Sequence, residues 1–90
     1  MDAEELVRRT ILRRLLNFRK IGGCHTAIHH LDSSLPSHIT SNKKGRKMIK
    51  AVIKELINEQ FLLCKISTNE LHVSINPQKL KEIKELLELQ

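Results

Sequence analysis

Aromatic residues are nearly absent from this chain: it has two phenylalanines, Phe18 and Phe61, and neither tryptophan nor tyrosine. Surfaces that stack the bases of single-stranded nucleic acids need exposed rings, so this scarcity argues against that mode of recognition. The 90 residues predict one domain whose core is built from Leu, Ile and Val. A chain this short buries only about 60–65% of its unfolded surface, so its core has to be compact and well patterned.

Cysteine is also scarce, because Cys24 and Cys64 are the only two and share no motif. This pattern predicts reduced thiols that pack as small hydrophobes, not a disulfide framework. No uncharged apolar run approaches the roughly 20 residues of a membrane-spanning helix. The opening "MDAEELVRR" lacks the apolar segment of a signal peptide. We therefore expect a soluble, cytoplasmic protein with no membrane association.

Catalytic signatures are missing as well: the sequence has no glycine-rich phosphate loop, no nucleophile elbow and no paired carboxylates in a plausible cleft. Cys24, His25, His29 and His30 lie within seven residues, and such crowding is unfavourable for a tetrahedral zinc site. We expect His25 and Thr26 to cap a helix and the other two histidines to lie partly exposed. The sequence predicts no enzyme activity, no metal and no cofactor.

Positive charge is abundant and unevenly distributed. The formal net charge is +6, and residues 42–54 contain six Lys or Arg and no Asp or Glu. Residues 61–90 are balanced, with four basic and four acidic side chains. Cations at a helix N-terminus oppose the helix dipole by about 0.3–1 kcal/mol each, so these charges do not serve helix stability. A polyanionic partner would resolve the conflict.

Helical periodicity of apolar residues predicts a first helix over 3–19, with Asp2 as its N-cap. A short second helix is predicted over 24–31. Residues 32–41 are turn-rich, and Pro36 prevents a continuous helix there. This ten-residue connection exceeds the usual helix-turn-helix length of about 3–4 residues, so we expect an unusual angle between the second helix and the third.

The third helix is predicted to begin after a cap at Ser41 or Asn42. Strand-like alternation follows in 62–66 and 71–75 and predicts a hairpin, with Asn69 in its turn. Asn76 and Pro77 then start a last helix. The predicted fold is mainly α with a small β-hairpin, in the order helix, helix, helix, hairpin, helix. The apolar residues that the third helix is expected to bury are Ile49, Val52, Ile53, Leu56 and Ile57.

This order is similar to that of the winged-helix superfamily, in which the hairpin is the wing. The phrases "KAVIKELINEQFLLCKISTNELHVSINP", "IGGCHTAIHHL" and "LPSHI" resemble small archaeal winged-helix proteins of uncharacterised function. The resemblance implies a winged-helix domain over 1–76, followed by a C-terminal helix over 77–90. It also implies that the N-terminal half of the third helix contacts DNA.

The resemblance also implies a set of contact residues on the third helix and the wing. Asn42 suits a bidentate contact to adenine and Arg46 one to guanine, whereas the lysines suit phosphate. The full predicted set is Ser41, Asn42, Lys43, Lys44, Arg46, Lys47, Lys50 and Lys65. Flanking phosphate contacts, or else ion pairs with Glu4 and Glu5, are expected for Arg13, Arg14, Arg19 and Lys20.

The last helix carries an apolar line, Leu80, Ile83 and Leu87, between alternating charges. Such a helix either seals the core or makes a two-fold contact in a homodimer, and we expect the homodimer. The predicted function is a small transcriptional regulator that binds duplex DNA. About five phosphate contacts would make log affinity fall against log salt with a slope of roughly −4 to −5. The alternatives are binding of structured RNA and interaction with an acidic protein partner.

Overall fold

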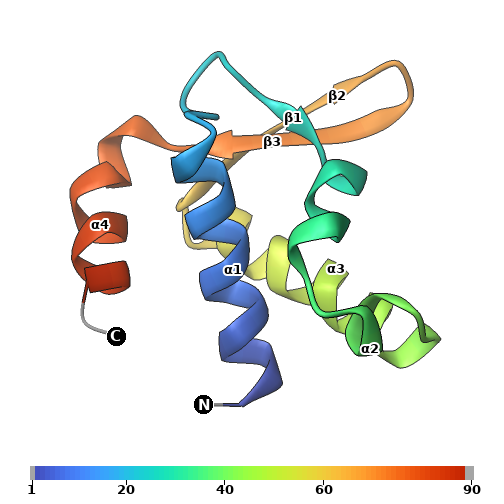
Figure 1. Ribbon diagram of the computed structural model, residues 1–90. Coiled ribbons are helices and arrows are strands. Elements are labelled where there is room, and N and C mark those ends of the chain that lie inside the picture. Colours follow the sequence, from blue (N-terminus) through green and yellow to red (C-terminus); the bar gives the residue numbers. More distant parts are fainter. Residues whose placement is uncertain (1, 89–90) are drawn as a thin grey trace.

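Helix α1 (Ala3–Asn17) lies at the centre of the computed structural model, which describes residues 2–88 (Figure 1). Asp2 caps it as predicted, because its carboxylate accepts a hydrogen bond of 2.7 Å from the N–H of Glu5. The helix ends two residues earlier than predicted, and Arg19 adopts a left-handed φ of 55°. The buried residues of α1 are Val7, Ile11, Leu12 and Leu15.

The second predicted helix starts later than expected. Strand β1 (Thr26–Ala27) pairs with Val73 and His72, and only then does the 3-10 helix η1 (Ile28–Ser34) begin. Because this pairing holds residues 26 and 27 extended, the helix cannot include them. The predicted cap by His25 or Thr26 is therefore wrong: Ala27 occupies the N-cap position and makes no side-chain cap bond.

The predicted ten-residue connection does not exist as a loop. Helix η1 runs to Ser34, and after Pro36 a short helix, α2 (Ser37–Thr40), fills most of the remaining stretch. Only residues 41 and 42 separate α2 from α3 (Lys43–Asn58). Leu35 and Ile39 are buried and hold this stretch on the core. The turn that precedes α3 is therefore short.

Strands β2 (Leu62–Ser67) and β3 (Glu70–Ile75) form the predicted hairpin, and β1 adds a third strand in the order β1-β3-β2. Thr68 and Asn69 have positive φ, as a two-residue hairpin turn requires. The hairpin extends beyond β1 and the helices beneath it (Figure 1). Most of β2 is consequently exposed.

The exposure of the hairpin overturns one prediction. Cys64 does not pack as a buried hydrophobe, because its strand passes beyond the core, and Cys24 in the loop before β1 is exposed as well. Both thiols are free. Ile66, which the alternation of β2 suggested would face inward, is 75% exposed.

Helix α4 (Leu80–Glu88) follows the short 3-10 helix η2 (Pro77–Lys79), and Asn76 provides the predicted cap by accepting a bond from the N–H of Gln78. Ile83 is fully buried in the chain's own core, and Leu80 and Leu87 pack partly buried against that core. These are the residues expected at a dimer contact. With these side chains α4 covers part of the core. Dimerisation through them stays a prediction.

The architecture is thus mainly helical with a small three-stranded antiparallel sheet. In Figure 1 the helices lie on one side of the sheet, with α4 and η1 on either side of α1 and α3 behind it. Between residues 2 and 88, none of the helices combines the length and the apolar character needed to cross a membrane.

Candidate nucleic-acid interface

Gly45 determines how α3 sits on the rest of the molecule. It is buried in the first turns of the helix, and a Cβ atom placed on it would lie 2.0 Å from the backbone oxygen of Ile39 in α2. The two helices therefore meet backbone to backbone at this point. The residues that α3 buries, which include Ile49, Val52 and Leu56, face the core as predicted. The opposite face is left to solvent.

Four lysines form a line along that outer face. They follow one another at intervals of four, three and four residues, which places side chains on the same side of a helix. All are exposed, and none forms an ion pair within residues 2–88. At 1.5 Å per residue the line is about 16 Å long. We refer to this set as the lysine stripe: Lys43, Lys47, Lys50 and Lys54.

The acidic residues of α3 do not neutralise the stripe. Glu55 and Glu59 both pair with Arg8 of α1, Glu55 at 3.9 Å. About three turns of lysine-bearing helix therefore face solvent, while the carboxylates of Glu55 and Glu59 bind α1. Lys44 is also exposed, and it lies about 100° around the helix from Lys43.

Asn42 and Arg46, the two residues expected to read bases, are engaged within the chain. The Asn42 carboxamide accepts a bond of 2.7 Å from the N–H of Gly45 and donates another to the backbone oxygen of His38. The Arg46 guanidinium donates to the backbone oxygen of Thr40 at 2.9 Å and lies 3.7 Å from the Asp32 carboxylate. Both side chains stabilise the junction between α2 and α3. Ser41 is exposed beside them.

Lys65 lies apart from the stripe. It is paired with His72 across the hairpin and lines a hollow that also includes His25. The neighbouring residue of β3, Leu71, faces α3 instead, as alternation along a strand requires. Lys65 and the lysines of α3 therefore lie on opposite sides of the hairpin.

The histidines of that hollow form a close pair. The Nδ1 atoms of His25 and His72 lie 2.9 Å apart, so one ring has to donate and the other to accept. Burial lowers the pKa of His25 from 6.5, and the positive charges of His72, Lys65 and Lys20 lower it further. The Nε2 atom of His72 is buried and has no hydrogen-bond partner within the described chain. This pairing was not predicted, because it joins residues far apart in the sequence.

The space between α3 and the hairpin is an apolar groove of about 730 Å³. Ile28, Ile53, Ile57 and Leu71 are its apolar lining residues, and Lys50, Lys54 and Glu70 also line it. Sequence reasoning missed this groove. The isoleucines of α3 were assigned to the core, and the sequence carries no signal that the hairpin projects past them.

The arginines of α1 divide into two groups. Arg8 and Arg9 bind carboxylates, Arg9 that of Glu5 at 2.9 Å. Arg14 instead stacks on the ring of Phe18, with its guanidinium carbon 4.4 Å from the ring centre. Arg9 therefore pairs with Glu5, although it was not among the residues for which that ion pair was expected.

Comparisons with protein-family profiles, with curated proteins and with solved structures give no match for this chain. Its function therefore has to be argued from its own residues and geometry.

Proposed function

We propose that this chain is a winged-helix protein that binds duplex DNA, with the lysine stripe of α3 facing the phosphates, and that it acts as a small transcriptional regulator. The observation that carries the proposal is a helix whose outward lysines have no carboxylate partner within residues 2–88. The short α2–α3 turn and the hairpin after α3 support the winged-helix assignment.

The binding chemistry follows from the side chains that remain available. Each lysine ammonium neutralises a phosphate and releases condensed counterions. A helix fits into the major groove, which is about 12 Å wide. Because the Asn42 amide and the Arg46 guanidinium already hold the α2–α3 junction, they contribute little to base recognition. We therefore expect the chain to bind duplex DNA with weak sequence preference.

The test is a salt titration of binding to a mixed-sequence duplex, measured by fluorescence anisotropy. The stripe variant K43Q/K47Q/K50Q/K54Q removes four charges from α3. If each contacts one phosphate, the slope of log affinity against log salt should become less negative by about 3–4. Affinity at low salt should fall as well.

A matched control removes the same charge elsewhere. The variant K65Q/K79Q/K81Q/K84Q has the same net charge as the stripe variant, and we expect its slope to change by less than about one. Equal losses in the two variants would show that only net charge matters and would overturn the role of α3. An RNA duplex that displaces the DNA at equal concentration would favour the structured-RNA alternative.

The groove between α3 and the hairpin favours a second candidate function. Its lining is apolar, and its two lysines, at positions 50 and 54, outnumber the single carboxylate of Glu70. Such a groove is complementary to a helix that carries both leucines and carboxylates. We infer that, in this second function, the groove binds an acidic amphipathic segment of a protein partner.

Ile57→Asn separates the two functions, because it removes part of the groove's apolar lining without changing the net charge. It should leave duplex binding within about twofold, but it should weaken binding of a synthetic peptide of leucines and glutamates about tenfold. Circular dichroism would check that the variant is folded. Peptide binding that survives this change would exclude the groove as its site.

A further inference from the structure

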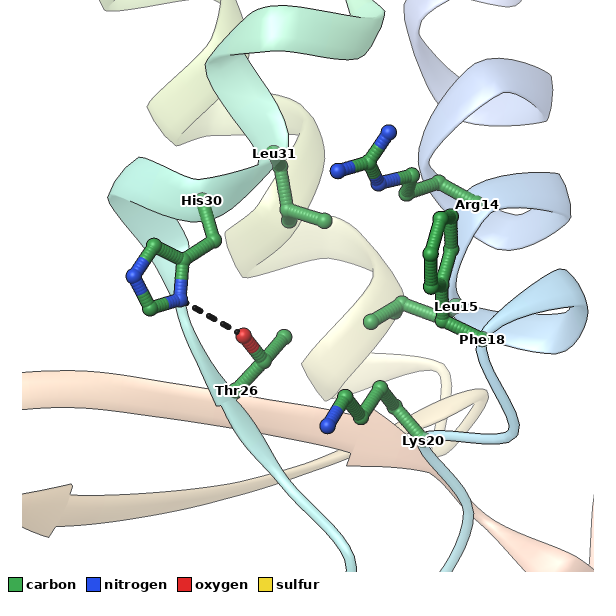
Figure 2. A pocket seen from close by; sticks show the side chains of 7 residues that line it. All are labelled: Arg14, Leu15, Phe18, Lys20, Thr26, His30 and Leu31. Atoms are coloured by element: carbon green, nitrogen blue, oxygen red, sulfur yellow. Dashed lines mark hydrogen bonds between the residues drawn. The ribbon is translucent and has the colours of Figure 1, made fainter.

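A second basic concavity lies between the C-terminal end of α1 and η1 (Figure 2). Its volume is about 220 Å³. Leu15 and Leu31, which are both buried, provide its apolar surface. Figure 2 shows polar and charged side chains around the same space. We refer to it as the α1–η1 pocket; its other lining residues are Arg14, Phe18, Lys20, Thr26 and His30.

The charge in the pocket is of one sign. Arg14 lines it from the last turn of α1, and Lys20 lines it from the segment that follows the helix. No Asp or Glu is among the lining residues. Within residues 2–88 neither cation forms an ion pair. Like charges that share a small concave site repel each other, and a bound anion would remove that repulsion. Positive charge that is concentrated without a partner is therefore better explained by a ligand than by stability.

The backbone holds these groups in place. The N–H of Lys20 donates to the oxygen of Leu15 at 2.8 Å, and the oxygen of Lys20 accepts from the N–H of Ile75 at 2.7 Å. The side chain of Lys20 thus starts from a position fixed against both α1 and β3. On the other wall, Thr26 is held in β1, and its hydroxyl lies 3.0 Å from Nδ1 of His30. This contact orients the imidazole and engages the ring nitrogen nearer the other lining residues, while Nε2 lies on the far side of the ring (Figure 2).

Phe18 supplies an apolar wall that is unusual for this chain. Its ring is 58% exposed, although it is one of only two phenylalanines. The Arg14 guanidinium stacks on it, an arrangement that is stabilising even at exposed sites. An exposed ring beside a cation can pack against the apolar body of a ligand while the cation binds its charged group.

We propose that the α1–η1 pocket binds a small phosphomonoester with an apolar or aromatic body. A phosphate group offers three oxygens and two negative charges, which matches the charged donors of Arg14 and Lys20. Arginine binds phosphate in a bidentate manner, and such charge-assisted bonds are about twice as strong as neutral ones. The body of the ligand lies against Phe18 and the two buried leucines. No lysine of α3 lines the pocket, so the site is independent of the proposed DNA interface.

The experiment is a titration of the whole chain with phenyl phosphate, followed by amide NMR. Saturable shifts are expected at Phe18, Lys20, Thr26 and Leu31. The variant R14Q/K20Q should weaken binding about tenfold or more, since the loss of one charge-assisted bond is sufficient for that factor. The matched variant K43Q/K47Q removes the same charge from α3 and should keep the dissociation constant within about twofold.

Phe18→Ala provides a second test that does not endanger the core, because the ring is exposed. It should weaken the binding of phenyl phosphate more than the binding of inorganic phosphate, which has no apolar body. Benzyl alcohol should not bind measurably. Four outcomes would each overturn the proposal. The shifts could cluster on α3 or never saturate, the two double variants could lose equal affinity, or benzyl alcohol could bind as well as phenyl phosphate.

Discussion

At the scale of the residue, Gly45 combines two properties that conflict in isolation. Glycine inside a helix costs about 1 kcal/mol relative to alanine, yet here its missing side chain lets α3 approach the backbone of Ile39. A glycine near the start of a basic helix could equally have allowed a ligand to approach closely. The structure shows that the approaching backbone is the chain's own, which no local pattern could reveal.

Gly45→Ala tests this account. The added Cβ would lie 2.0 Å from a backbone oxygen, so α2 has to move. We expect the free energy of unfolding to fall by about 1–3 kcal/mol, because overpacking outweighs the gain in helix propensity. Urea denaturation measures it. Gly23→Ala is the control: no atom lies within 4 Å of its Cβ position, and its effect should stay within about 0.5 kcal/mol. An unchanged stability for Gly45→Ala would contradict the close contact.

His25 makes stability depend on pH. Its pKa is lowered in the folded chain below the ordinary 6.5, so below that pH the unfolded chain binds more protons than the folded one. This contribution to stability is complete above about pH 6.5 and is lost as the pH falls from there through the lowered value. The melting temperature should therefore drop between about pH 7.5 and pH 5.5. His25→Gln should make that drop smaller; an unchanged pH dependence would show that the pair with His72 has no such effect.

At the scale of the element, local signals were reliable and contacts between distant elements were not. The caps Asp2 and Asn76 were identified, and Asn42 was one of two candidates for the third helix, because a cap depends on residues within three positions. The hairpin turn was predictable for the same reason. Strand β1 was missed because it exists only through its pairing with β3, more than forty residues later.

Helix α4 illustrates what an amphipathic pattern leaves open. Its leucines and isoleucine could equally have faced a second copy, and only the packing of Ile83 in the core decides how that residue is used. Ile83→Ala should lower the free energy of unfolding by about 2–5 kcal/mol. Urea denaturation at two protein concentrations checks it, and the loss should be the same at both.

Lys84→Ala serves as the control on the exposed side of α4, with an expected change within about 0.5 kcal/mol. If Ile83→Ala dissociated a dimer in size-exclusion chromatography without destabilising the chain, α4 would instead be an interface.

At the scale of the whole molecule, the sequence predicted the mainly helical composition, the hairpin and the outward lysines of α3. It assigned Asn42 and Arg46 to base contacts, but in the structure both side chains hold α2 against α3. The groove was not predictable, since it brings together residues from segments that are far apart in the sequence. The α1–η1 pocket is lined by residues 14–31, but it depends on how α1 and η1 pack. A composition can indicate that a chain favours anions, but not where a concave site will form.

The strand order β1-β3-β2 has a consequence for how copies of this chain behave when concentrated. Strand β2 is an outer strand, and its free backbone edge can template a strand from another molecule. Lys65 stands in the middle of that edge, between exposed Leu63 and Ile66, and a charge at such a position discourages edge-to-edge association. Lys65→Val should therefore promote self-association, visible as increased light scattering. By this account Lys65 limits self-association of the chain.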